Sequence, residues 1–281
     1  MVQLIPDGIR RMVSREPSPQ LGHRNAIVIS VCAQKGGVGK TTTAVNMACA
    51  LANEHKMRVL LVDMDSQGHV ASSLHGVLPP SLAGSMSDIL LAKKRDISEI
   101  ARATSVNGLD VTPSDKRLNE TESVIGARIG KEFLLRQAVR AARTHYDFIV
   151  IDCPPNLGNL TLNALLASHY ALIPSDMSVL SLEGVHDILE AIETINERLG
   201  HDLRLLGLLR TKVDGRNRSL NDSICEVLER DYSELLLDSQ IPINTALSKA
   251  QFAGRPVFEY APRSSGAKAY RALADEVLTR L

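Results

Sequence analysis

The segment that decides the fold runs from residue 27 to residue 53 and reads IVISVCAQKGGVGKTTTAVNMACALAN. It contains an apolar stretch (Ile27–Cys32), a glycine-rich loop (Ala33–Lys40) and a stretch that can form a helix (Thr41–Asn53). A strand, a glycine-rich turn and a helix in this order are typical of a phosphate-binding loop, because backbone N–H groups and the positive end of the helix face the phosphate oxygens. The segment therefore predicts a nucleotide-binding α/β domain.

The predicted phosphate contacts form one continuous run: Gly36, Gly37, Val38, Gly39, Lys40, Thr41 and Thr42. The glycines let the backbone turn its N–H groups inward. Lys40 is expected to reach the β- and γ-phosphates, and the Thr41 hydroxyl is expected to bind Mg²⁺. The usual pattern has a glycine five residues before Gly39, but this chain has Gln34 there.

Two acidic segments follow apolar stretches that read as strands. They are DMDSQG, residues 63–68, and YDFIVIDCPP, residues 146–155. Both place carboxylates at the carboxyl ends of strands, where open α/β sheets bind ligands. Asp152 is predicted to hold Mg²⁺ through a water molecule. Asp63 is either a support beside the metal or a structural residue, and the sequence leaves both readings open.

Apolar strands alternate with helical stretches along the rest of the chain, which predicts a mostly parallel central sheet covered by helices on both faces. The expected strands are Val59–Asp63, Phe148–Asp152, Ala171–Pro174 and Leu205–Leu209. The expected helices are Phe133–Thr144, Leu160–Ala167, Leu182–Leu199, Ser219–Tyr232 and a final one with an apolar stripe from Tyr270 to Leu281. Residues 1–24 are predicted to be a flexible tail, and residues 25–281 one ATPase domain.

Composition excludes several classes of protein. The 281 residues carry 32 basic and 32 acidic side chains, so any nucleic-acid or membrane contact must come from a local patch. Four cysteines lack a disulfide or zinc spacing, which favours a cytoplasmic protein. The chain has neither a signal-peptide pattern nor a run of 18 apolar residues, so no membrane span is expected.

With its loop read as KGGVGKTT, residues 35–42, the chain resembles the ParA family of partition ATPases, in the deviant Walker A group of P-loop NTPases that also contains MinD. The resemblance covers about residues 26 to 281. It extends to the motifs EG at 183–184, DGR at 214–216, IP at 241–242, GRPV at 254–257 and PRSSGA at 262–267. The resemblance implies Mg²⁺-dependent hydrolysis of ATP and an ATP-dependent homodimer that sandwiches two nucleotides.

The same resemblance assigns roles to individual residues. It implies that Lys35 crosses to the phosphates of the partner subunit, while Lys40 acts within its own subunit. Asp65 matches the switch aspartate that positions the attacking water. The adenine contacts are expected from residues that follow two late strands: Thr211, Lys212, Pro242 and Asn244.

Members of the family typically bind DNA without sequence preference and are stimulated by a ParB-like partner. Two basic segments in this chain are compatible with phosphate contacts. The candidates are Arg216, Arg218, Lys249 and Arg255. One departure stands against this reading, because Ala246 occupies a position where many members carry arginine.

The first hypothesis is therefore a nucleoid-associated ATPase that positions a plasmid, a chromosome region or a protein cargo. The alternatives are a MinD-like regulator that binds membranes, a redox or cluster-carrying relative, and an enzyme that couples ATP to ligation or transport. A membrane regulator needs a basic amphipathic tail, whereas the last turns contain only Arg271 and Arg280 as basic residues. The cysteines also do not match a shared cluster: Cys32 lies in the first strand, and Cys49 in the first helix.

Overall fold

A mostly parallel sheet forms the centre of the domain in the computed structural model, which describes residues 25–80, 84–92, 96–176, 178–214, 230 and 232–281. The strands are β1 (Ile27–Val31), β2 (Val59–Asp63), β3 (Arg102–Ala103), β4 (Leu109–Thr112), β5 (Phe148–Asp152), β6 (Tyr170–Asp176), β7 (Arg204–Val213) and β8 (Leu236–Pro242). They pair in the order β3-β4-β2-β5-β1-β6-β7-β8, and only β3 with β4 is antiparallel among these pairs of described strands. The predicted fold class is confirmed.

Helices connect the strands and cover the sheet. The α-helices are α2 (Lys40–Asn53), α3 (His69–Leu74), α4 (Met86–Leu91), α5 (Leu118–Gly126), α6 (Leu134–Ala138), α7 (Asn159–Ala167), α8 (Val179–Leu199), α10 (Thr245–Phe252), α11 (Val257–Tyr260) and α12 (Ser265–Arg280). Short 3-10 helices are η1 (Ile97–Glu99), η2 (Lys131–Phe133), η3 (Ala142–Thr144) and η4 (Ser233–Leu235).

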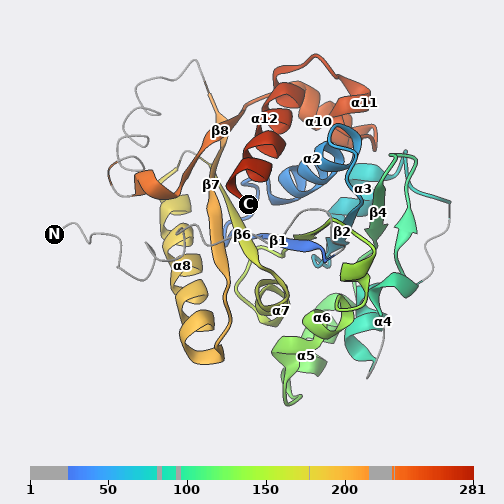
Figure 1. The fold of residues 1–281 in the computed structure, drawn as a ribbon, viewed down its shortest axis with the longest axis vertical. Coiled ribbons are helices and arrows are strands. Elements are labelled where there is room, and N and C mark those ends of the chain that lie inside the picture. The colour runs from blue at the N-terminus through green and yellow to red at the C-terminus, as the bar shows by residue number, and fades with distance from the viewer. Residues whose placement is uncertain (1–24, 81–83, 93–95, 177, 215–229, 231) are drawn as a thin grey trace.

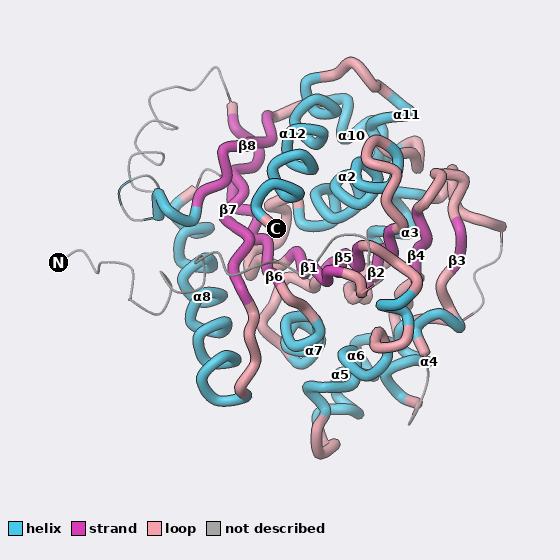
Figure 2. The backbone as a smooth tube through the Cα atoms, in the orientation of Figure 1, coloured by secondary structure: helices cyan, strands magenta, loops and turns pink. Residues whose placement is uncertain are grey.

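The sheet separates two hydrophobic cores. Figure 1 shows α2, α10, α11 and α12 on one side of the sheet and α5, α6 and α7 on the other, and Figure 2 shows the strands between these layers. Successive side chains of a strand point to opposite faces. Accordingly, Ile27 and Ile29 join the core beneath α2 and α12, whereas Val28 joins the core beneath α7 and α8.

The register of the central strands brings the acidic motifs together. Val31 of β1 pairs with Asp152 of β5, and Asp63 of β2 pairs with the same Asp152. Because the strands are parallel, their carboxyl ends meet at one edge of the sheet. The phosphate loop leaves β1 at this edge, so the loop and both carboxylates share one location.

Helix α12 packs along α2, the helix that follows the phosphate loop. Tyr270 of α12 is fully buried, and its hydroxyl lies 3.2 Å from the hydroxyl oxygen of Thr43 in α2. Leu273, Ala274 and Val277 continue the same buried face, as their helical spacing predicts. The side-chain oxygen of Asn46 accepts a hydrogen bond from the Val257 N–H, which fixes α2 to α11 as well.

The structure also departs from the predicted elements. The expected helix Phe133–Thr144 is divided into η2, α6 and η3, and the N–H groups of Phe133 and Thr144 donate to carbonyl oxygens three residues earlier rather than four. The expected helix Ser219–Tyr232 lies mostly outside the described residues. Across the helices that the structure describes, none is both long and apolar enough to span a membrane.

Candidate nucleotide-binding site

The phosphate loop adopts a conformation that requires glycine. Gly37 and Gly39 have φ angles of 78° and 93°, in the left-handed region that residues with a Cβ rarely adopt. A Cβ added at Gly36, Gly37 or Gly39 would meet no atom within 4 Å. Gly39 is also the N-cap of α2, so no cap side chain covers the N–H groups of its first turn. The loop thus offers open space and backbone donors for an anion, as its sequence predicts.

Lys40 begins α2 and lies inside the site. Its side chain is 7% exposed, and its ammonium nitrogen donates to the carbonyl oxygen of Lys35 at 3.0 Å. Burial lowers the pKa of Lys40, while the nearby charges of Asp152 and Asp65 act in the opposite direction. The structure therefore places a buried cation at the loop, where a phosphate would provide the opposite charge.

Thr41 and Asp152 form the predicted metal-binding pair. The Thr41 hydroxyl donates to Asp152 Oδ2 at 2.7 Å. Asp152 is fully buried, and its other oxygen, Oδ1, has no hydrogen-bond partner among the described residues. Burial, followed by the charge of Asp63, raises the pKa of Asp152 well above its ordinary value. A cation beside Oδ1 would stabilise the charged carboxylate.

These residues fit a magnesium ion that arrives with a nucleotide. A hydroxyl and a carboxylate are the hard oxygen ligands that Mg²⁺ prefers, and the ion usually takes its other ligands from phosphate and water. No group of three or more His, Cys, Asp or Glu side chains in the described part of the chain could hold a metal ion by itself. Thr41 and Asp152 would hold such an ion, which would supply charge neutralisation to the phosphates.

Asp63 and Asp65 flank the same edge of the sheet. Asp63 is fully buried, and its two oxygens accept the N–H groups of Asp65, at 3.0 Å, and Val70, at 3.3 Å. Burial raises the pKa of Asp63 to about 7, against the effect of these hydrogen bonds. Asp63 therefore connects the end of β2 to the start of α3, and a role beside the metal stays a prediction.

The carboxylate of Asp65 lies in the turn between β2 and α3. Its Oδ1 accepts the Gln67 N–H at 3.0 Å, and its carbonyl oxygen accepts the Ser114 hydroxyl at 2.6 Å. The residue is 7% exposed. Asp65 lies close enough to Lys40 and Asp152 to influence their pKa values, so it belongs to the same charged site. Its action on an attacking water remains a prediction.

Lys35 makes contacts that the sequence did not indicate. Its ammonium nitrogen lies 3.1 and 3.2 Å from the two carboxylate oxygens of Asp176, and 2.9 Å from the Ser178 hydroxyl oxygen. Asp176 ends β6, and Ser178 precedes α8. The rule that identified Asp63 and Asp152 from their positions at strand ends would also have identified Asp176.

The two predicted adenine contacts after β7 differ in exposure. Thr211 is 2% exposed, and its hydroxyl donates to the carbonyl oxygen of Val38 at 2.7 Å, so it supports the phosphate loop directly. Lys212 is exposed and has a φ angle of 52°. A left-handed non-glycine residue is uncommon, and such residues concentrate at functional sites. Contacts between adenine and either residue stay predictions.

The other two adenine candidates lie after β8. Pro242 ends that strand, and Asn244 is the N-cap of α10. The side-chain oxygen of Asn244 accepts the Ala246 N–H at 2.7 Å, while its amide nitrogen donates to the Ser265 hydroxyl oxygen at 2.5 Å. Asn244 thus joins α10 to α12, and its predicted contact with adenine is untested.

The candidate DNA contacts are only partly described. Lys249 lies in the last turn of α10, and Arg255 follows that helix; both are exposed. The Arg255 N–H donates to the carbonyl oxygen of Ala250, which places the two basic residues on one short segment. Arg216 and Arg218 lie outside the described residues. The role of all four in binding DNA remains a prediction.

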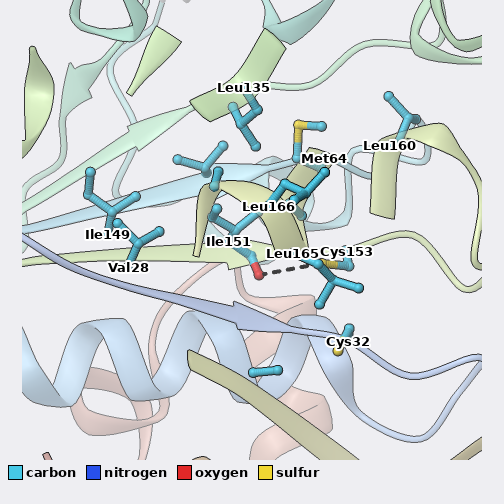
Figure 3. Packing of buried hydrophobic residues seen from close by; sticks show 14 of the residues in the cluster. Val28, Cys32, Met64, Leu135, Ile149, Ile151, Cys153, Leu160, Leu165 and Leu166 are labelled. Atoms are coloured by element: carbon cyan, nitrogen blue, oxygen red, sulfur yellow. Dashed lines mark hydrogen bonds between the residues drawn. The ribbon is translucent and has the colours of Figure 1, made fainter. Parts of the chain in front are cut away.

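The cysteines near the site belong to the hydrophobic core. Figure 3 shows Cys32 and Cys153 beside Ile151 and Leu165. Cys153 is 1% exposed, and burial raises the pKa of its thiol well above the ordinary value. Burial likewise raises the pKa of Cys32 to about 12. A protonated, buried thiol is a poor nucleophile, which agrees with a packing role.

Comparisons with known proteins agree with this geometry. Residues 26–205 match the sequence model of a family described as an AAA domain. The chain is 40% identical to the sporulation initiation inhibitor protein Soj of Bacillus subtilis over 250 residues, which cover 89% of this chain and 97% of Soj. It is 37% identical to the chromosome partitioning protein ParA of Myxococcus xanthus, over 90% of this chain and 88% of that protein.

A solved structure from Mycobacterium smegmatis is similar throughout. It is described as a cobyrinic acid a,c-diamide synthase with a bound ATP analogue and magnesium. The TM-score is 0.76 at 34% identity, and the similarity covers 90% of this chain and 94% of that chain.

Proposed function

This chain belongs to the ParA family of P-loop ATPases, and we propose that it is a DNA-associated positioning ATPase that pairs in its ATP-bound form. Its cargo would be a plasmid, a chromosome region or a protein assembly, and a ParB-like protein would stimulate its turnover. The name of the Myxococcus relative, a chromosome partitioning protein, supports a role in the positioning of a chromosome region. The proposed place of action is the nucleoid.

The arrangement of charge at the phosphate loop carries the proposal. Lys40 is buried at the loop, and Asp152 has a buried oxygen that lacks a partner among the described residues. A nucleotide with Mg²⁺ supplies an anion for the first and a cation for the second. Phosphoryl transfer requires mainly positioning and neutralisation of charge, which these residues provide. Lys35, on the same loop, would complete the charge balance at the phosphates of a second subunit.

Lys40, Thr41 and Asp152 would hold the nucleotide and its metal within one subunit. Asp65 would orient the attacking water at the γ-phosphate. Lys35 would then couple hydrolysis to subunit release, because its partner phosphate is lost on turnover. In this scheme ATP determines whether the protein is a pair, and a pair doubles the number of basic residues that face DNA.

The proposal is tested by DNA binding at two salt concentrations, with ADP and with a slowly hydrolysed ATP analogue. We expect strong, salt-sensitive binding only with the ATP analogue and little preference among sequences. Each neutralised phosphate contributes a slope of about −0.9 in log affinity against log salt concentration. The double variant Lys249→Ala/Arg255→Ala should therefore reduce the slope by up to about 3.6, which corresponds to four contacts in a pair.

A matched control removes the same charge from the opposite layer. Arg136 and Arg140 are exposed in and after α6. The double variant Arg136→Ala/Arg140→Ala should leave the slope of DNA binding unchanged. Equal DNA affinity with ADP and ATP, or no effect of the Lys249/Arg255 variant, would refute the DNA-carrier function. Binding to anionic vesicles would then favour the MinD-like alternative, and turnover indifferent to DNA and partner would favour ATP-driven ligation.

A further inference from the structure

Ser114, in the loop that follows β4, contacts the turn that carries Asp65. Its hydroxyl donates to the carbonyl oxygen of Asp65 at 2.6 Å, although the two residues are 49 positions apart. The N–H of Gly68 donates to the same oxygen at 3.0 Å. A carbonyl oxygen has two lone pairs, and both have a donor here. The peptide group that follows Asp65 is therefore fixed from two sides.

The other hydrogen bonds of Asp65 are local. Its N–H donates to Asp63 Oδ1 at 3.0 Å, and its Oδ1 accepts the N–H of Gln67 at 3.0 Å. Among the described residues, Ser114 provides the one hydrogen bond to Asp65 from a distant part of the chain. The local bonds hold the shape of the turn, whereas the bond from Ser114 ties the turn to the end of the neighbouring strand β4.

Ser114 also packs against the rest of the turn. A Cβ added at Gly68, whose φ angle is 64°, would lie 3.7 Å from Ser114 Oγ, so the two residues are in close contact. Burial raises the pKa of Asp63, and hydrogen bonding from Ser114 is among the effects that oppose it. The Ser114 hydroxyl therefore lies within reach of both aspartates at this end of β2.

The next residue, Asp115, fixes this loop to α4. Its two carboxylate oxygens accept the hydroxyls of Ser85 at 2.8 Å and Ser87 at 2.5 Å, and Arg117 Nε donates to it at 2.8 Å. Arg117 also pairs with Asp88 of α4 at 3.1 Å. Burial alone would raise the pKa of Asp115, but these hydrogen bonds lower it overall. Asp115 is thus a charged acid that holds the loop in one position.

The role predicted for Asp65 depends on accurate placement. A catalytic group must be held within about 0.5 Å of its productive position. A displacement of about 1 Å can cost on the order of 100-fold in rate. Asp65 lies in a short turn rather than in a helix or strand. Its position consequently depends on contacts from outside the turn, and Ser114 supplies such a contact.

We propose that Ser114 is a positioning residue of the ATPase reaction, which fixes the backbone of Asp65 and is itself held to α4 through Asp115. This inference rests on the proposed function, in which Asp65 orients the attacking water. The hydroxyl acts on the backbone of Asp65 and not on the phosphate loop or the metal-binding pair. Its loss therefore lowers the rate of turnover and leaves the affinity for ATP nearly unchanged.

The contact can be tested without turnover. Hydrogen exchange of the nucleotide-free protein, followed by mass spectrometry, measures how often the N–H groups of residues 65–68 open. Ser114→Ala should increase their exchange rate about fivefold, the effect expected from the loss of one hydrogen bond. Ser114→Thr, which keeps the hydroxyl, should remain within about twofold of the wild type. Ser123→Ala is the matched control and should change nothing, because the exposed Ser123 hydroxyl donates within α5, to the carbonyl oxygen of Asn119 at 3.4 Å.

Phosphate release and nucleotide titration test the effect on the reaction. Ser114→Ala should lower kcat about tenfold and change KM by less than about twofold. Ser114→Thr should restore kcat to within about twofold of the wild type. Asp115→Asn, which removes the charge that holds the loop, should lower kcat about threefold with the same small change in KM. Asp115→Asn also provides the test if Ser114→Ala does not fold.

A double substitution tests whether Ser114 acts through Asp65. The variant Asp65→Ala/Ser114→Ala should have the same kcat as Asp65→Ala to within about twofold, because the group that Ser114 positions is already absent. Two independent residues would instead multiply their effects, and the double variant would be about tenfold slower than Asp65→Ala.

Different results would overturn different parts of the proposal. Unchanged exchange of residues 65–68 in Ser114→Ala would refute the contact. Faster exchange with unchanged kcat, or a fall in kcat with an equal loss of ATP affinity, would refute the positioning role. A slower double variant would refute action through Asp65. If Asp65→Ala itself keeps the wild-type kcat, the proposed role of Asp65 fails and the positioning role fails with it, whereas the exchange result still judges the contact.

Discussion

At the carboxyl-terminal edge of the sheet, Asp63 and Asp152 are fully buried acids, whereas the amino-terminal edge has a half-buried His169 and a buried Tyr146. His169 accepts the N–H of Val28 at 2.9 Å, and burial followed by the charge of Arg143 lowers its pKa to about 4. Burial and then the hydrogen bond to Asp110 raise the pKa of Tyr146. Both groups at this edge act in their neutral forms.

Burial favours the neutral form of ionisable groups at both edges, but only the groups at the amino-terminal edge act in that form. A neutral His169 satisfies a backbone N–H, so the amino-terminal edge needs no ligand. A magnesium site needs charged carboxylates, so the carboxyl-terminal edge is costly until a cation and an anion arrive. The comparison indicates that the ionisable groups at the amino-terminal edge support the fold, whereas those at the carboxyl-terminal edge are arranged for a ligand.

The largest effect is expected from a substitution at the carboxyl-terminal edge, on the affinity for ATP. Lys40→Ala should weaken ATP binding on the order of 100-fold or more, because a buried charge that meets the phosphates is removed. Lys56→Ala is the matched control at the amino-terminal edge, where the ammonium nitrogen of Lys56 donates to the Asn53 carbonyl oxygen at 2.6 Å. Titration with a fluorescent nucleotide measures both variants. Equal affinity in the two would contradict the difference between the edges.

A second substitution separates turnover from binding at the same edge. Asp65→Ala should lower kcat on the order of 100-fold, because the attacking water loses its positioning group, while ATP affinity stays within a few-fold. Phosphate release and nucleotide titration provide the two measurements. Asp110→Asn, at the start of β4, should leave kcat unchanged. A parallel loss of ATP affinity in Asp65→Ala would assign Asp65 to the binding of metal instead.

The pH dependence of stability sharpens the comparison at the carboxyl-terminal edge. Burial raises the pKa of Asp63 from 3.8 to about 7, so the folded chain binds this proton more tightly than the unfolded chain does. The nucleotide-free protein should therefore lose stability as pH rises from about 4 to about 7. Mg²⁺ and ATP should restore it, with an increase in Tm of roughly 10 °C at saturation.

Differential scanning fluorimetry across this pH range, with and without Mg-ATP, measures the effect. The gap between the two melting curves should widen as pH rises. Asp152→Asn, which removes one buried carboxyl group that titrates, should flatten the nucleotide-free profile and reduce the gap. A gap that narrows toward high pH would show that the carboxylates are not charged on binding.

The smallest effect is expected at the amino-terminal edge and has the opposite sign. The pKa of His169 falls from 6.5 to about 4 on folding, so its contribution to stability is present above pH 6.5 and is lost as pH falls toward 4. His169→Gln retains an acceptor for Val28 but does not titrate. Between pH 7 and pH 4, this variant should lose about 2 kcal/mol less of its free energy of unfolding than the wild type does. Urea titrations at both pH values measure this, with exposed His145→Gln as a control that keeps the wild-type loss.

The parts of the site that the sequence predicted are local in the chain. The loop from Gly36 to Thr42 was predicted because strand, glycines and helix follow one another directly. Asp152 was predicted because it ends an apolar strand. By contrast, Lys35 and Asp176 are separated by 141 positions, and nothing between them signals that they meet. Contacts of this kind depend on the order of strands in the sheet, here the pairing of β1 with β6.

The least predictable part of the fold lies between β2 and β5. The sequence predicts no helix or strand in residues 64–132, where the structure has short helices and the strands β3 and β4. These elements contain two to nine residues each, too few to show a clear period. β4 is specified by its parallel pairing with β2, which is a tertiary contact.

The contact between α2 and α12 joins a segment that is translated early to one that is translated late. Thr43 lies two residues after the predicted magnesium ligand Thr41, and its partner Tyr270 is added 227 positions later. Until the codons for α12 have been translated, the helix that follows the phosphate loop has an uncovered apolar face. We therefore expect ATP to stabilise the folding chain only after α12 has been synthesised, late in the translation of the domain.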